Sequence, residues 1–249
     1  MRRCAVLAGV GGHVPPAGAH PTTVDLAVPA AAAALRSAQV SAVDLLVLAT
    51  ATQDHAAAGV AARLGLDARA LDIETGCAAF GYGLSVVESM LTAGRASLAL
   101  LVGVDTADAS PLSTDAAGAV VLRAGEPCES GAVHGHDSGE LRSGCRPGDR
   151  HAAGRMLTSA RTALGRAGWT AADVEILIAH QADAIALGAG LGIPTVTENP
   201  GTMGNTVAAS IPLALAQVSL APGTRTLLSA FGGAGTWGAV ALKWPRPAG

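Results

Sequence analysis

Hydrophobic positions along the chain alternate between short runs of β-branched and aliphatic residues and longer Ala-rich stretches. The short runs are typical of buried strands, and the longer stretches are typical of helices that pack on them. This alternation predicts a layered α/β protein. In the first part of the chain we expect strands at 4–10, 43–49, 70–73, 98–104 and 118–122, and helices at 24–39, 55–64 and 77–93.

The same order of elements returns in the second part of the chain. Leu46 precedes Cys77 by 31 positions, and Leu177 precedes Asn205 by 28. An internal duplication explains this, so we expect one pseudo-symmetric unit with halves at 1–124 and 151–249. The segment 125–150 is rich in Gly, Ser, Asp and His, which predicts mainly loop. The second half is expected to hold helices at 152–167, 183–190 and 205–220, and strands at 174–179, 195–197, 226–230 and 238–242.

Composition narrows the class of protein further. The chain has 55 Ala and 32 Gly but only six aromatic residues, which predicts closely packed helices and strands. Half of the residues are hydrophobic, which excludes disorder, and a net charge of −3 argues against a nucleic-acid binder. No apolar run is long enough to span a membrane, and four irregularly spaced cysteines do not make a disulfide framework. We therefore expect a cytoplasmic protein without a membrane or nucleic-acid partner.

A cysteine lies where a predicted strand turns into a predicted helix. Cys77 is at the start of the helix expected at 77–93. The helix dipole and the unpaired amides at that position favour a nucleophilic thiolate. The alternative is a buried cysteine with a purely structural role.

Two further polar residues occupy similar junctions. His180 ends a hydrophobic strand, where open α/β sheets place ligands and catalytic groups. Asn205 follows a Gly-rich turn at the start of a helix, where helix capping is the simpler explanation. A histidine with only a structural role at a strand end is likewise the simpler explanation for His180. One Cys, one His and one Asn at matching ends of repeated units nevertheless favour a shared site.

These segments resemble β-ketoacyl-acyl carrier protein synthase III. The resemblance covers about 24–243 and rests on four motifs in order: 76–85 around Cys77, 180–182 with His180, 204–210 with Asn205, and the Gly-rich segment 230–238. It implies a thiolase-like fold, in which two pseudo-symmetric βα halves form α-β-α-β-α layers. It also implies a homodimer, with a heterodimer with a homologue as the alternative.

The resemblance also implies a mechanism. Cys77 would take an acyl group from a thioester of a carrier protein or coenzyme A, with the amides of Cys77 and Gly233 as the oxyanion hole. His180 and Asn205 would stabilise the enolate left when a malonyl thioester loses carbon dioxide. Phe231 and Gly232, together with Gly233, would belong to the active-site loop. This chemistry requires no metal and no cofactor.

The chain departs from the family pattern in three places. The segment that clamps the coenzyme A nucleotide is missing between Gly11 and Thr23. The basic residue that usually follows the His-Gln-Ala motif is absent from 183–192, which leaves carrier-protein docking to other arginines. The Phe-Pro element that lines the acyl tunnel is absent from 53–65, so the sequence does not predict which acyl chain the enzyme prefers.

Two other functions remain alternatives. One is an acyltransferase that passes the acyl group to an oxygen, nitrogen or sulfur acceptor without decarboxylation. The other is a non-catalytic partner subunit of a larger homologue. A metal site is not expected, because the linking segment matches no common zinc pattern: its candidate ligands are Cys128, His134, His136, Cys145 and His151.

Overall fold

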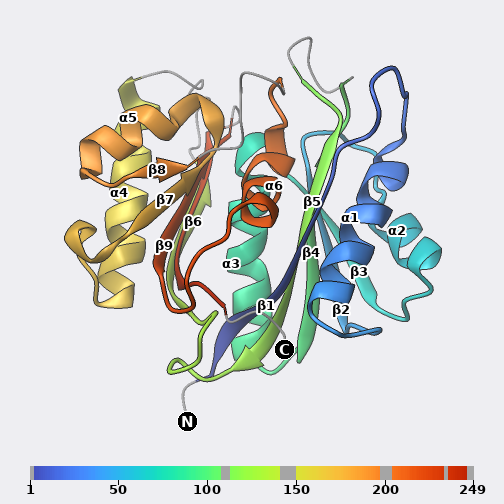
Figure 1. Ribbon diagram of the computed structural model, residues 1–249, viewed down its shortest axis with the longest axis horizontal. Helices are drawn as coiled ribbons and strands as arrows, with labels where there is room; N and C mark the ends of the chain where they lie inside the picture. Colours follow the sequence, from blue (N-terminus) through green and yellow to red (C-terminus); the bar gives the residue numbers. More distant parts are fainter. Residues whose placement is uncertain (1–2, 108–112, 141–149, 197–203, 233–234, 246–249) are drawn as a thin grey trace.

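The computed structural model describes the chain except residues 1–2, 108–112, 141–149, 197–203, 233–234 and 246–249 (Figure 1). Its core consists of two five-stranded sheets. The first sheet has the order β1-β5-β4-β2-β3, in which β2 is parallel to β3 and β4, and β5 is antiparallel to β4 and β1. Its strands are β1 (Cys4–His13), β2 (Leu45–Thr50), β3 (Arg69–Glu74), β4 (Leu98–Asp105) and β5 (Ala116–Gly125).

The second sheet repeats this arrangement, displaced by five strands. Its order is β6-β10-β9-β7-β8, with β7 parallel to β8 and β9, and β10 antiparallel to β9 and β6. The prediction of mainly loop at 125–150 is wrong for Val133–Glu140, which forms β6. The strands are β6 (Val133–Glu140), β7 (Ile176–Ala179), β8 (Thr195–Val196), β9 (Arg225–Phe231) and β10 (Thr236–Lys243).

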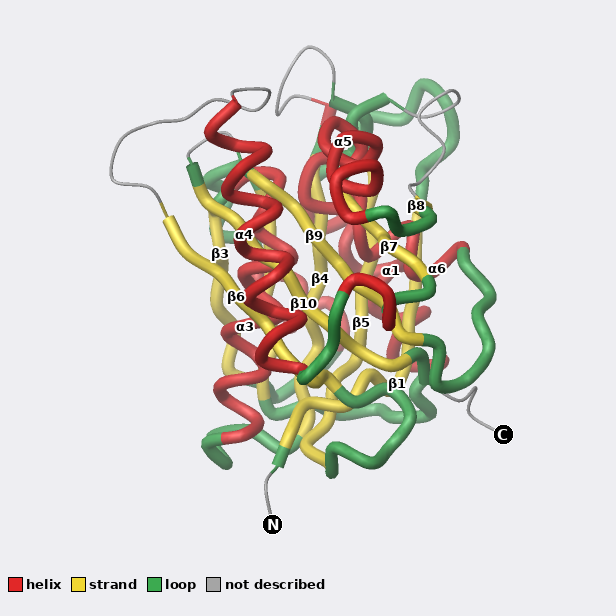
Figure 2. The backbone as a smooth tube through the Cα atoms, turned by 90° about the vertical axis from the view of Figure 1, so that its left-hand side faces the viewer, coloured by secondary structure: helices red, strands yellow, loops and turns green. Residues whose placement is uncertain are grey.

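The helices form one layer between the two sheets and one layer on the outer side of each (Figure 1), and Figure 2 looks onto the outer layer of the second sheet. α1 (Thr23–Ser37) and α2 (Ala57–Leu64) cover the first sheet, and α4 (Arg150–Ala167) and α5 (Gln181–Leu191) cover the second. α3 (Ala79–Thr92) and α6 (Ser210–Gln217) lie between the sheets and contact each other. The layering is therefore the predicted α-β-α-β-α. Three short 3-10 turns complete the described elements: η1 (Gly76–Ala78), η3 (Ala171–Asp173) and η4 (Val207–Ala209).

Local sequence signals account for several helix ends. α1 begins with a capping box, in which Thr22 and Asp25 satisfy each other's backbone amides. Gly94 and Gly168 follow α3 and α4 in the left-handed conformation that closes helices. Buried Ala residues let α1 approach the sheet closely, and among the described residues the largest fully buried side chains include two aromatic rings, those of Phe80 and Phe231. The high Ala content thus reflects thin, tightly packed layers.

Candidate active site

The turn between β3 and α3 places Cys77 at the start of a helical segment. Gly76 adopts a left-handed φ of 64°, which reverses the chain after β3, and η1 leads directly into α3. Cys77 is half-buried, two residues before α3 begins. The residue therefore lies at the N-terminal end of the helical segment, where the positive end of a helix dipole favours a thiolate.

His180 follows the last residue of β7, as its position in the sequence predicts. Its amide donates to the carbonyl of Ser229 in the neighbouring β9, 3.1 Å away, which anchors the strand end. The side chain is 2% exposed, and burial lowers the pKa of His180 to about 4. The imidazole is therefore neutral at pH 7, and it can act as a hydrogen-bond donor or acceptor but not as a resident cation.

The ring of His180 is held by a residue that the sequence interpretation did not single out. Its Nδ1 lies 3.0 Å from the hydroxyl oxygen of Ser210, the buried first residue of α6. When this hydroxyl donates to Nδ1, the ring proton resides on Nε2, which can then donate to a substrate oxygen. The signal for Ser210 was present in the sequence, because it closes the motif that contains Asn205.

Asn205 precedes η4 and makes two contacts that fix its orientation. Its side-chain Oδ1 accepts a hydrogen bond from the backbone amide of Val207 at 3.0 Å. Its backbone carbonyl accepts one from the backbone amide of Thr114 at 2.9 Å. The capping interpretation of Asn205 is therefore partly right, although the helix α6 itself begins only at Ser210. With Oδ1 engaged, the Nδ2 group is the end of the amide that can donate to a ligand.

The two turns that carry Cys77 and Asn205 meet between the sheets. η1 contacts η4, and η1 also contacts β9 and β10 of the second sheet. Because His180 is bonded to Ser210, immediately after η4, all three predicted residues lie around one junction. This junction can hold a nucleophile beside two neutral hydrogen-bonding side chains.

The end of β9 packs against the Cys77 turn. The amide of Gly232 donates to the carbonyl of Thr236 at 2.8 Å, and the hydroxyl of Thr236 donates to the carbonyl of Thr75 at 2.9 Å. A Cβ atom at Gly232 would overlap with the Thr75 carbonyl oxygen. Phe231 is fully buried at the end of β9. Gly233 lies outside the described residues, so its part in an oxyanion hole stays a prediction.

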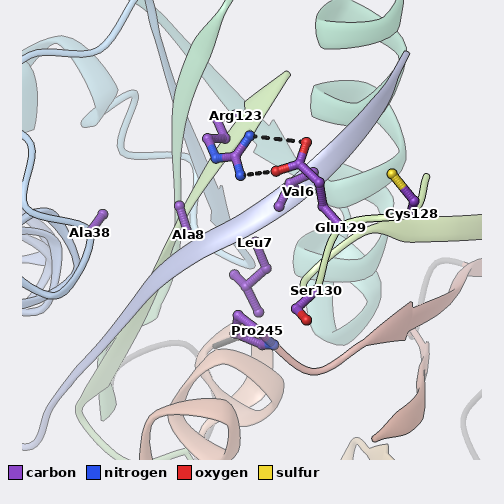
Figure 3. A pocket seen from close by; sticks show the side chains of 9 residues that line it. All are labelled: Val6, Leu7, Ala8, Ala38, Arg123, Cys128, Glu129, Ser130 and Pro245. Carbon is purple, nitrogen blue, oxygen red and sulfur yellow. Dashed lines mark hydrogen bonds and ion pairs between the residues drawn. The ribbon is translucent and has the colours of Figure 1, made fainter. Parts of the chain in front are cut away.

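A cavity of about 500 Å³ lies away from this junction, where β1 passes the turn after β5 (Figure 3). It is lined by Val6, Leu7, Ala8, Ala38, Arg123, Cys128, Glu129, Ser130 and Pro245. Arg123 forms an ion pair with Glu129 at its wall, and Cys128 lies at its edge. None of Cys77, His180 and Asn205 lines it, so it is separate from the candidate active site.

The described residues contain no group of three or more His, Cys, Asp or Glu side chains that could hold a metal ion. Two of the candidate ligands in the sequence are not covered by that finding, since Cys145 and the side chain of His151 are outside the described part. Nε2 of His136 lies 3.0 Å from a carboxylate oxygen of Glu88 in α3. In the described part of the chain, no helix combines the length and apolar character required to cross a bilayer.

Comparison with known proteins places the chain in a family. The family model for 3-oxoacyl-[acyl-carrier-protein] synthase III matches residues 71–138, and the model for the C-terminal region of that synthase matches 164–244. The β-ketoacyl-[acyl-carrier-protein] synthase III of Pseudomonas aeruginosa is 42% identical over 271 residues, which cover 89% of this chain and 82% of that protein. The chain belongs to the β-ketoacyl-acyl carrier protein synthase III family. It is therefore an enzyme of the acyltransferase class.

Other synthase III proteins agree in sequence and in fold. One of Streptomyces coelicolor is 40% identical over 278 residues, covering 90% of this chain and 83% of that protein. The crystal structure of the Pseudomonas aeruginosa PAO1 synthase III superimposes with a TM-score of 0.88 at 37% identity, covering 99% of this chain and 100% of that one. The Aquifex aeolicus synthase III gives 0.84 at 27% identity, covering 96% and 100%. The thiolase-like fold predicted from the motifs is thus confirmed.

Proposed function

We propose that this enzyme condenses an acyl group held on Cys77 with a malonyl thioester. In the first step, the Cys77 thiolate attacks the carbonyl carbon of an acyl thioester and expels the donor thiol. In the second step, the malonyl thioester loses carbon dioxide, and the electrons of the broken C–C bond form an enolate. The enolate carbon attacks the acyl-Cys77 carbonyl, forms the new C–C bond and releases the Cys77 thiolate.

Each polar group has a separate part in this sequence. Neutral His180 and the Nδ2 group of Asn205 donate to the malonyl thioester oxygen, where negative charge develops during decarboxylation. The amides of Cys77 and Gly233 receive the oxyanion that forms at the acyl carbonyl. The scheme only breaks and forms C–S and C–C bonds, without net oxidation or reduction. It therefore requires neither a metal nor a redox cofactor.

The meeting of η1 and η4 carries this proposal. Acyl transfer alone requires Cys77 and an oxyanion hole, whereas the junction also holds a neutral histidine and an oriented amide. Two neutral donors beside a nucleophile suit an enolate, because they stabilise charge that appears only after carbon dioxide leaves. This arrangement favours condensation over simple transfer.

The donors, partners and compartment are part of the proposal. The relatives carry acyl carrier protein in their names, which supports thioesters of a carrier protein or of coenzyme A as substrates. A homodimer would join two copies through β3, the outer strand of the first sheet, where Arg69 and Ala70 are exposed. We keep the cytoplasm as the expected compartment.

Two measurements on the same sample test the proposal. Intact-protein mass spectrometry after incubation with acetyl-coenzyme A and acetyl-pantetheine measures acylation. Release of labelled carbon dioxide from the matching malonyl thioesters measures decarboxylation, with methylmalonyl and acetyl thioesters as comparison substrates. We expect an added acyl mass, carbon dioxide and a 3-oxoacyl product. Acylation without carbon dioxide from any malonyl donor, with transfer to an alcohol or amine, would establish the acyltransferase alternative instead.

A further inference from the structure

Asp105, the last residue of β4, is a fully buried carboxyl group that the mechanism above does not use. Its Oδ1 accepts the hydroxyl of Thr50 at 3.0 Å and the amide of Ala51 at 2.7 Å. Its Oδ2 accepts the amide of Ala208 at 2.8 Å. Three donors therefore share two oxygens, and the third belongs to the turn η4 of the other half of the molecule.

The η4 turn is closely docked on the end of β4. A Cβ atom at Gly103 would overlap with the carbonyl oxygen of Ala208, so the turn approaches the strand backbone directly. Val207, beside Ala208, has a left-handed φ of 49°, an unfavourable conformation for a β-branched residue. Such a conformation persists only where surrounding contacts enforce it, and the Asp105 bond to Ala208 is one of them.

The turn that Asp105 holds carries both groups proposed to stabilise the enolate. Val207 donates its amide to Oδ1 of Asn205, and Ser210, two residues after Ala208, is bonded to His180. We propose that Asp105 is a positioning residue, whose carboxylate holds the η4 turn in place and so orients Asn205 and His180 for decarboxylation. This inference rests on the proposed condensing function.

A carboxylate fits this task better than an amide. Burial raises the pKa of Asp105 to about 6, against the hydrogen bonds from Ala51, Ala208 and Thr50 that lower it, and nearby Asp54 raises it further. At pH 7.5 the group is ionised and both oxygens accept. An Asn side chain has one acceptor and one donor, so it would leave the amide of Ala51 or of Ala208 without a partner.

The test compares Asp105→Asn with Asp54→Asn at pH 7.5. Asp54 accepts the hydroxyls of Thr23 and Thr52, and among the described residues no hydrogen bond joins it to η4, so its substitution removes a neighbouring charge without releasing that turn. Asp105→Asn should lower carbon dioxide release from malonyl-pantetheine by about 10-fold or more, the scale expected for misplaced groups. Acetylation of Cys77, measured by mass spectrometry, should change less than about 2-fold because Asn205 serves the other step. Asp54→Asn should leave both rates unchanged.

A double-mutant cycle with Asn205→Ala separates positioning from general damage. If Asp105 acts through the turn that orients Asn205, its substitution should cost much less in the Asn205→Ala background than alone. Equal losses of acetylation and decarboxylation, full additivity, or a fully active Asp105→Asn would each overturn the inference.

If Asp105→Asn yields no acetylatable protein, Thr50→Val tests the same point, because it removes one hydrogen bond from the same carboxylate. It should lower decarboxylation by about 3-fold without lowering acetylation. Absence of that loss would also overturn it, whereas a wild type without carbon dioxide release would overturn the proposed function.

Discussion

The turns η1 and η4 occupy matching places in the two halves and differ in what they carry. Each follows the outermost strand of its sheet and leads into a helix of the middle layer, but η1 carries Cys77 and η4 follows Asn205. Each is clamped by the opposite half: Thr236 of the second half holds the Thr75 carbonyl, and Asp105 of the first half holds the Ala208 amide. The proposed nucleophile is thus held by a residue of the second half, and the turn beside the proposed enolate donors is held by a residue of the first half.

The clamps also differ in strength and in the backbone they hold. η1 begins with Gly76, for which a left-handed φ costs little energy. η4 begins with Val207, a β-branched residue for which the same conformation is unfavourable. The first is held by a threonine hydroxyl and the second by a buried carboxylate, and hydrogen bonds to charged groups are the stronger kind. Under the proposed function, the two turns serve different steps through different residues at matching places, and we expect substitutions to affect the two steps separately.

The largest effect is expected at the first turn. Cys77→Ala should abolish the acyl adduct completely, because no other described residue at the junction is a thiol. Cys128→Ser is the matched control, since Cys128 is exposed, away from the junction. Intact mass after exposure to acetyl-pantetheine measures both variants. A full adduct in Cys77→Ala would remove the nucleophile from η1 and end the comparison.

The equivalent change at the second turn should affect only the second step. Asn205→Ala should lower carbon dioxide release from a malonyl thioester by about 10²-fold, the scale of losing one oxyanion-type donor. Formation of acyl-Cys77 should stay within about 2-fold, because no enolate forms in that step. If Asn205→Ala slowed acylation of Cys77 as much as decarboxylation, the two turns would not serve separate steps.

The sequence predicted most of the strands and helices that carry these residues, but not the contacts that hold the two turns. The order of strands, the end of β7 at His180 and the start of the Cys77 helix follow from local patterns of apolar residues and glycines. β6 was missed because its polar, Gly-containing sequence becomes a strand only by pairing with β10. The helix expected at 205–220 is shorter, since contacts distant in sequence dictate η4: Asp105 and Ala208 are 103 positions apart. No window of local sequence contains that bond.

A smaller effect is expected from filling the space between each turn and its clamp. Gly103→Ala would press on the Ala208 carbonyl, and Gly232→Ala on the Thr75 carbonyl. Each substitution should lower the free energy of unfolding by about 1–3 kcal/mol through overpacking. Gly103→Ala should slow decarboxylation more than acylation, and Gly232→Ala should do the reverse. Gly154→Ala is the control, because nothing lies within 4 Å of a Cβ there. Identical kinetic profiles for the two glycine variants would show that the clamps are not specific to their turns.

The smallest effect is expected on the pH dependence of stability, through two buried titratable side chains: Asp105 at the end of β4 and His180 directly after β7. Burial lowers the pKa of His180 from 6.5 to about 4, so its contribution to stability is present above pH 6.5 and is lost as the pH falls towards 4. Burial raises the pKa of Asp105 from 3.8 to about 6, so its contribution is present below pH 3.8 and is lost as the pH rises through 6. Between pH 4 and 6 the two contributions have opposite slopes and offset each other.

When either side chain is replaced, the free energy of unfolding should depend on pH as the remaining side chain dictates. Relative to the wild type, His180→Gln should gain stability as the pH falls from 6 to 4.5, because Asp105 then acts alone. Asp105→Asn should lose stability over the same range, because protonation of His180 is no longer offset. Each slope cannot exceed about 1.4 kcal/mol per pH unit for one proton. Urea unfolding at half-unit intervals of pH measures both variants beside the wild type. Slopes of the same sign in the two variants would show that these strand ends do not titrate as opposing groups.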